Sequence, residues 1–163
     1  SFRTSNGDVV TMRAALRLME AGASLSEITS RTLDQRPLAS VRLWAQAIDE
    51  LSLKDGILWT SVTREMRQRW HLNGNSFSGL ANFLSGVREA KIVAVFAERD
   101  DGTVDVGLRS VPGYNVADVA LKLGGGGHPQ AAGCTLTGDL GVIERSVLAE
   151  IRRSLAEQRL VGT

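Results

Sequence analysis

Hydrophobic residues in the first part of the chain recur three or four positions apart, which is the spacing of one face of an α-helix. The first such set comprises Met12, Ala15, Leu16 and Met19. We therefore expect a helix here that ends at Gly22, a residue type suited to a helix C-terminus. A capping box at residues 24–27 predicts a second, short helix that runs to about Leu33.

A third helix is expected after Asp34-Gln35-Arg36-Pro37, because proline ends one helix and suits the first turn of the next. The hydrophobic stripe of this helix would comprise Val41, Trp44, Ala45, Ile48 and Leu51. We place a domain boundary near Asp34. Residues 1–34 would then form one unit and residues 35–163 another.

The hydrophobic spacing changes in the middle of the chain, where apolar runs lack the helical period. Ile57–Val62 and Ile92–Ala97 predict strands, and the second is apolar enough to be covered on both faces. The turn signal Arg99-Asp100-Asp101-Gly102 joins the second run to residues 103–109, which alternate between apolar and polar. In this returning strand Arg109 lies on the polar face, opposite the valines and the leucine.

Three residues with side chains suited to a helix N-terminus predict short helices between and after these strands: Thr63, Ser76 and Asn115. A short strand at Cys134–Thr137 and a long amphipathic helix from Leu140 to Leu155 follow. Strands that pair locally but interleave with helices predict an α/β (α+β-like) fold. We expect a mixed or antiparallel sheet of about four to five strands, packed by helices.

Charge and composition narrow the partners of this 163-residue chain. It contains 19 Lys and Arg residues and 18 Asp and Glu residues. The resulting net charge of +1 offers no broad positive field to attract long nucleic acid. The single cysteine excludes an intrachain disulfide and favours a reducing cytoplasm. Apolar runs of membrane-spanning length and a signal-peptide pattern are both missing from the sequence, so a membrane partner is not expected.

The stretch Gly124–Gly133, with the sequence GGGGHPQAAG, is the strongest candidate for chemistry. Each glycine loses roughly 0.5–1 kcal/mol more on folding than alanine, so the four together lose about 2–4 kcal/mol. Without Cβ atoms their N–H groups could converge on a phosphate or carboxylate. A flexible linker is the alternative, although the His-Pro and Ala-Ala-Gly that follow are not typical of linkers.

Arg109 and His128 are the side chains most suited to an anion near this stretch. A guanidinium forks onto phosphate, and Arg109 lies near a strand end shortly before the glycine run. The alternative for Arg109 is a solvated surface arginine. His128 could hydrogen-bond a phosphate or stack on a base, or it could brace its own loop.

Three segments together resemble a known family: Leu123–Gly133, Leu108-Arg109-Ser110 and Asn115-Val116. They are similar to the C-terminal substrate-binding domain of the DHH phosphoesterase superfamily, DHH-associated domain 1. The likeness is greatest to its bacterial nanoRNase and phosphoadenosine-phosphate phosphatase (oligoribonuclease) branch. It extends from about Pro37 to the C-terminus, and Gly79–Leu84 is part of it.

The resemblance implies roles for particular residues. Gly125, Gly126, Gly127 and His128 would contact the substrate, and Arg109 would grip a phosphate. Neither a catalytic residue nor a metal ligand is expected in this chain, because the sequence contains no Asp-His-His triplet. The resemblance places manganese in an N-terminal DHH domain, for which residues 1–6 would be the trailing segment. The chain would thus be an inactive fragment of a two-domain hydrolase.

The function implied is degradation of short oligoribonucleotides together with dephosphorylation of phosphoadenosine phosphate. The implied partners are the DHH domain and a short RNA or nucleotide, and a homodimer is left open. One alternative is another DHH phosphoesterase acting on cyclic dinucleotides, polyphosphate or single-stranded DNA, although the net charge of +1 argues against long DNA. Another is a non-catalytic nucleic-acid-binding module such as the C-terminal domain of alanyl-tRNA synthetases.

Overall fold

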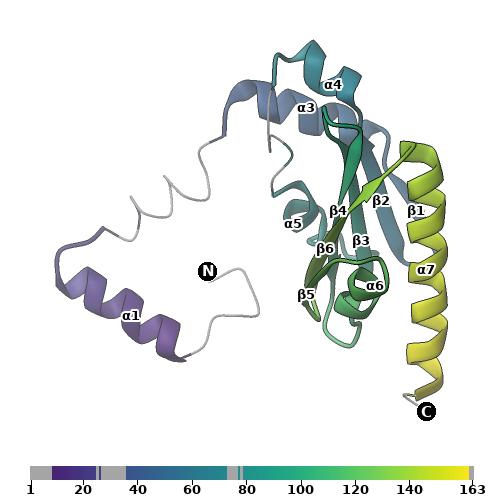
Figure 1. Cartoon of the computed structure of the whole chain (residues 1–163). Coiled ribbons are helices and arrows are strands. Elements are labelled where there is room, and N and C mark those ends of the chain that lie inside the picture. The colour runs from purple at the N-terminus through teal and green to yellow at the C-terminus, as the bar shows by residue number, and fades with distance from the viewer. Residues whose placement is uncertain (1–8, 25, 27–35, 73–76, 78, 162–163) are drawn as a thin grey trace. The chain divides into compact units, whose positions relative to one another are not determined.

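The computed structural model describes residues 9–24, 26, 36–72, 77 and 79–161 (Figure 1). The chain divides into two compact units, Ser1–Pro37 and Leu38–Thr163. In the first unit, helix α1 (Val9–Glu20) ends as predicted at Gly22, whose positive φ of 92° lets its N–H reach the carbonyl of Met19. Most of the helix expected at 24–33 and the boundary near Asp34 lie outside the described residues.

Six strands of the second unit form one sheet in the order β1-β2-β3-β4-β6-β5. They are β1 (Ser52–Lys54), β2 (Ile57–Val62), β3 (Ile92–Glu98), β4 (Thr103–Ser110), β5 (Gly126–His128) and β6 (Ala131–Thr137). Strands β2 and β3 are parallel and the other neighbours are antiparallel. The predicted mixed sheet is confirmed. The three-residue strands β1 and β5 raise the strand count above the four to five expected.

Helices cover the sheet on two sides (Figure 1). Helices α3 (Leu38–Asp49), α4 (Arg64–Arg69) and α5 (Leu80–Leu84) share one hydrophobic cluster with alternate residues of β2 and β3. Helices α6 (Val116–Lys122) and α7 (Leu140–Val161) share the other cluster with the opposite faces of β3, β4 and β6. Strand β3 takes part in both clusters, which explains its uninterrupted apolar sequence.

Two predicted helix caps are present. The side chain of Thr63 accepts a hydrogen bond from the N–H of Met66, and the side chain of Asn115 accepts one from the N–H of Ala117. Helix α5 begins at Leu80 after Gly79, and Ser76 lies outside the described residues.

The stripe predicted for α3 is partly wrong. Leu43 and Ala47 face the sheet, whereas Val41 is 47% exposed and Ala45 is exposed too. The inward face is centred about one position away from the predicted stripe. Because both sides of this helix carry apolar residues, periodicity alone did not distinguish them.

The β4-β6-β5 part of the sheet is packed in a hydrophobic cluster on one face, whereas α5 contacts the other face only at β4, where Ala81 lies beside Gly107. Alternate residues such as Val106, Leu108, Ala132 and Cys134 are packed in the cluster with α6 and α7. The residues between them are half-buried or exposed, and we call this surface the open face. It comprises Thr103, Asp105, Gly107 and Arg109 of β4, Ala131, Gly133, Thr135 and Thr137 of β6, and Gly126 and His128 of β5.

Candidate functional site

The first two glycines of the run cap helix α6. The N–H of Gly124 donates to the carbonyl of Leu121 at 3.0 Å, and the N–H of Gly125 donates to the carbonyl of Ala120 at 2.8 Å. Gly124 has φ of +80°, as the left-handed residue of such a cap requires. The prediction that the glycine amides converge on an anion is therefore wrong for Gly124 and Gly125, because their N–H groups donate to carbonyls in the last turn of the helix.

The remaining glycines form strand β5, which pairs with β6 around the two-residue turn Pro129-Gln130. The N–H of Val116 donates to the carbonyl of Pro129 at 2.8 Å, and the N–H of Ser110 donates to the carbonyl of Gln130 at 3.2 Å. The three motifs singled out in the sequence thus meet at this turn, where Ser110 and Val116 hold the hairpin that carries His128.

Three glycines of this hairpin are required by its packing. A Cβ on Gly125 would lie 2.2 Å from the carbonyl oxygen of Gly133, and a Cβ on Gly127 would lie 2.5 Å from that of Ala131. A Cβ on Gly133 would lie 2.7 Å from the carbonyl oxygen of Val106. Since real Cβ contacts this short do not occur, only glycine fits at these positions.

Gly126 and Gly107 have no such requirement. A Cβ on Gly126 would meet no heavy atom within 4 Å, and one on Gly107 would meet its nearest neighbour, the Cβ of Ala81, at an ordinary 3.8 Å. Neither glycine is among those with positive φ. Ala81 of α5 lies over Gly107, which accounts for a small residue at that position, whereas packing does not require glycine at position 126.

The strand register aligns the site residues in two rows across the open face. Gly107, Gly133 and Gly126 are directly opposite one another on β4, β6 and β5, and we call them the glycine row. Arg109, Ala131 and His128 form the next row. Arg109 and His128 therefore point to the same side of the sheet, with backbones about 10 Å apart, since neighbouring strands are about 4.8 Å apart.

Arg109 is a half-buried cation for which the described residues supply no carboxylate. Its Nη1 donates to the carbonyl oxygen of Leu108 at 2.8 Å. Burial lowers the pKa of Arg109 below its usual value, which is the sign of a charge that is partly removed from water. An arginine keeps its charge in proteins, so the arrangement favours an external anion. His128, by contrast, is exposed.

A cluster of charged residues at the other end of the open face was missed by the sequence analysis, which interpreted residues 99–102 only as a turn. The carboxylate of Asp105 accepts hydrogen bonds from Thr135 Oγ1 at 2.7 Å and from Arg99 Nε at 2.6 Å. Hydrogen bonding and the charge of Asp105 raise the pKa of Arg99. The signal available in the sequence was that Asp105 falls on the same face as Arg109.

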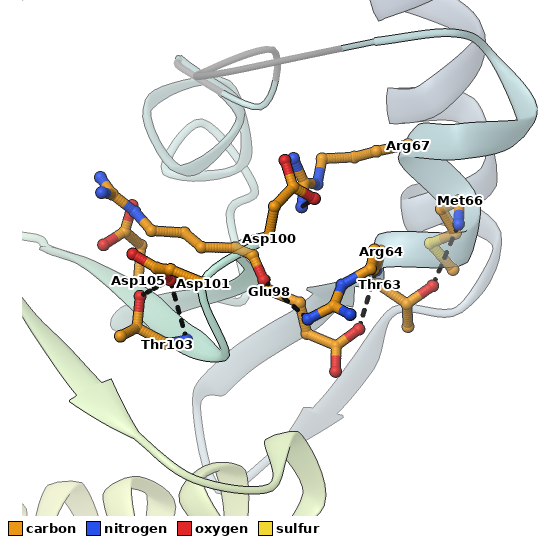
Figure 2. A network of polar contacts seen from close by, with 10 residues as sticks. Thr63, Arg64, Met66, Arg67, Glu98, Asp100, Asp101, Thr103 and Asp105 are labelled. Carbon is orange, nitrogen blue, oxygen red and sulfur yellow. Dashed lines mark hydrogen bonds and ion pairs between the residues drawn. The ribbon is translucent and has the colours of Figure 1, made fainter.

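An ion pair and a hydrogen bond join the end of β3 and the turn after it to helix α4 (Figure 2). The side chain of Arg67 is only 4% exposed and its Nη2 lies 3.0 Å from Asp100. The carboxylate of Glu98 accepts a hydrogen bond from the N–H of Arg64 at 2.7 Å. In the same turn, hydrogen bonds from Thr103 lower the pKa of Asp101. These contacts fix the end of the β3-β4 hairpin from which Asp105 projects.

Within the described ranges, no three His, Cys, Asp or Glu side chains gather closely enough to hold a metal ion. The described residues therefore do not fit a manganese centre. In the same ranges, none of the helices has the length and apolar character needed to cross a membrane.

Comparison with known proteins identifies the class. The chain belongs to the DHHA1 domain family, which matches residues 60–157. This confirms the resemblance to the C-terminal domain of the DHH superfamily that Leu123–Gly133 and Leu108-Arg109-Ser110 predicted.

Two relatives carry the same name, bifunctional oligoribonuclease and PAP phosphatase NrnA. The one from Thermus thermophilus is 33% identical over 156 residues, which cover 95% of this chain and 47% of the relative. The one from Mycoplasma genitalium is 28% identical over 136 residues, which cover 83% and 42%. The chain therefore spans about half the length of these relatives.

Two solved structures share the fold. An exopolyphosphatase-related protein from Bacteroides fragilis superposes with a TM-score of 0.81 at 16% identity, over 99% of this chain and 47% of that protein. PggH, a pGpG-specific phosphodiesterase from Vibrio cholerae, superposes with a TM-score of 0.55 at 15% identity, over 94% and 53%.

Proposed function

We propose that this chain is the substrate-binding C-terminal part of a metal-dependent phosphoesterase that degrades short oligoribonucleotides and dephosphorylates phosphoadenosine phosphate. Membership of the DHHA1 family and the names of the two relatives support this proposal. The metal, manganese by the resemblance, and the activated water would be supplied by a preceding DHH domain. The present chain would bind and orient the nucleotide, and would hydrolyse nothing alone.

The observation that carries the proposal is glycine at position 126 of the open face, where a Cβ would meet no heavy atom within 4 Å. Gly107 and Gly126 lie on either side of Gly133 in the glycine row. Glycine in a strand weakens the strand, and it often marks a place where a ligand approaches the backbone closely. A nucleotide lying over Gly133 and Gly126 would account for the glycine at position 126.

Arg109 and His128 supply the chemistry beside this row. A phosphate placed against the guanidinium of Arg109 would satisfy the half-buried charge that lacks a carboxylate among the described residues. One such cation, in a chain of net charge +1, suits a single phosphate better than a long polyanion. This supports a mononucleotide or the end of a short oligomer as the bound species.

The substitution Gly126→Ala tests the role of the glycine row. Because its Cβ would point into open space, the free energy of unfolding should change by less than about 1 kcal/mol. Binding of a nucleoside monophosphate, followed through the amide resonances of residues 126–128 and the side chain of Arg109, should weaken by about 1–3 kcal/mol, as for an overpacked contact.

Gly141→Ala is the matched control, because this glycine lies in α7 and its Cβ would make only ordinary contacts at 3.4 and 3.5 Å. It should leave nucleotide binding unchanged. Gly125→Ala gives the contrasting result, a loss of stability of about 1–3 kcal/mol or more, because its Cβ would overlap the backbone of β6. If nucleoside monophosphate leaves the resonances of residues 126–128 and Arg109 undisturbed in the unsubstituted chain, the proposal is wrong.

A further inference from the structure

We propose that Asp105 selects the base of the bound nucleotide by accepting a hydrogen bond from an exocyclic amine. This inference rests on the proposed function, since it takes the phosphate to lie against Arg109. Asp105, Gly107 and Arg109 alternate on β4 and therefore lie on the same face of the sheet. Ala81 lies over Gly107, so a nucleotide extending from Arg109 would pass over Gly133 and Gly126 and would meet Asp105 where it pairs with Thr135.

The spacing suits a single nucleotide. Asp105 and Arg109 are four residues apart on a regular strand, which corresponds to roughly 13 Å between their backbones. The long side chain of Arg109 and the shorter one of Asp105 both reduce the gap between their charged groups. With the phosphate at Arg109 and the sugar over Gly133 and Gly126, the base would lie beside Asp105.

The carboxylate of Asp105 is held in a fixed orientation and keeps acceptor capacity. Thr135 donates to one of its oxygens and Arg99 to the other, at 2.7 and 2.6 Å. An ionised carboxylate has about four acceptor sites, so these two bonds leave others free. The side chain is 19% exposed, which leaves the carboxylate reachable from the open face.

The neighbouring Arg99 determines whether the carboxylate of Asp105 repels a nucleotide or binds it. An unpaired carboxylate on this face would repel the phosphate of the same ligand. The ion pair with Arg99 offsets part of that charge, and the remaining lone pairs can still accept hydrogen bonds. The group therefore suits a neutral amine donor, and Thr135 restrains the direction from which that donor can approach.

The bases differ at the atom that this acceptor would contact. Adenine and cytosine carry an exocyclic amine donor where thymine, and likewise uracil, carries a carbonyl acceptor. Asp105 should therefore favour cytosine over uracil, two bases of the same size that differ at this position. The substrate class would be short oligoribonucleotides whose bound residue carries an amino base.

Titration of the chain with cytidine and uridine 5′-monophosphates tests this, with the dissociation constants taken from the amide resonances of residues 126–128. We expect cytidine monophosphate to bind about threefold to tenfold more tightly, as one net hydrogen bond provides. Asp105→Asn should abolish or invert this ratio of the affinities for cytidine and uridine monophosphate, because an amide can donate to the carbonyl of uracil. Arg109 remains in place, so both ligands should still bind.

Asp101→Asn is the matched control. This carboxylate also accepts hydrogen bonds from a threonine, Thr103, but it lies in the turn after β3 and not on the open face. It should leave the cytidine-to-uridine ratio unchanged. If Asp105→Asn does not fold, Thr135→Val keeps the carboxylate but removes one of its restraints, and should lower the ratio toward one.

Equal affinity of the unsubstituted chain for the two monophosphates would overturn the base selection and leave the proposed function intact. A ratio that survives in both Asp105→Asn and Thr135→Val would also overturn it. Failure of both monophosphates to bind would instead count against the proposed function itself.

Discussion

The two halves of the sheet bury their residues differently. Strand β3 lies between two hydrophobic clusters, and six of its seven positions are buried. Strand β6 alternates, with Ala132 and Cys134 buried and Thr135 and Thr137 exposed. Both halves belong to one hydrogen-bonded sheet. The difference lies in how many layers of helices cover each half.

This difference places the candidate site. A strand covered on both faces cannot present a side chain to a ligand, because helices occupy both sides of it. The open face is the part of the sheet where a charged Arg109, an exposed His128 and Gly126, which packing does not require, can coexist. Stability should therefore depend mainly on one half of the sheet and binding on the other, and the predictions that follow test this separation.

The largest effect is expected in the covered half. Phe96 of β3 is completely buried, so Phe96→Ala should lower the free energy of unfolding by about 3–5 kcal/mol through lost burial and a new cavity. Thr137→Ala on the exposed side of β6 should change it by less than about 0.5 kcal/mol. Denaturant unfolding of the two variants measures both values, and comparable losses would contradict the division of the sheet.

Much of the fold could be predicted from the sequence. The apolar run of β3, the alternation of β4 and the caps at Thr63 and Asn115 each reflect a local rule that the fold obeys. Strand β1 was missed because three residues give no period to detect. The orientation of α3 was only partly right, because both of its sides carry apolar residues and packing on the sheet chose between them.

The site was predictable in its residues but not in its geometry. The motifs indicated that Arg109 and the glycine-histidine stretch act together, and the register places Arg109 and His128 in one row. Whether these residues bind substrate stays a prediction. The sequence did not reveal that Gly124 and Gly125 cap α6, because their partners are backbone carbonyls. Nor did it reveal that Ala81 lies over Gly107, which depends on how α5 packs on the sheet.

Replacement of Arg109 should separate binding from stability. Arg109→Ala should weaken binding of a nucleoside monophosphate by about 1.5–3 kcal/mol, the range for a hydrogen bond to a charged group. The free energy of unfolding should change by less than about 1 kcal/mol, since no ion pair is broken among the described residues. Arg109→Lys keeps the charge but loses the planar fork, so its affinity should be intermediate.

Isothermal calorimetry and denaturant unfolding on the same samples check this prediction. An Arg109→Ala variant with unchanged affinity would remove Arg109 from the site. A large loss of stability would instead show that this arginine serves the fold, and the open face would then not differ from the rest of the sheet in the way proposed.

The smallest effect is expected at Cys134, which lies on the covered face of β6 but responds to the open face. Burial raises the pKa of its thiol from the usual 9.0, and the negative charge of Asp105 adds to the shift. The folded protein should consequently react with iodoacetamide at pH 8 at least about tenfold more slowly than the unfolded chain, because the thiolate is the nucleophile.

The raised pKa of Cys134 also predicts how the free energy of unfolding changes with pH. With a raised folded pKa, the unfolded chain loses its thiol proton first, so stability is fully present below pH 9.0 and declines as the pH rises through the folded value. The free energy of unfolding of the unsubstituted chain, minus that of Cys134→Ala, isolates this decline. Asp105→Asn should make this decline smaller and end it at a lower pH, since it removes the second cause of the raised folded pKa. If Asp105→Asn leaves the titration of Cys134 unchanged, the carboxylate on the open face does not affect the thiol on the opposite face. The contrast between the two faces of this part of the sheet is then sharper than proposed.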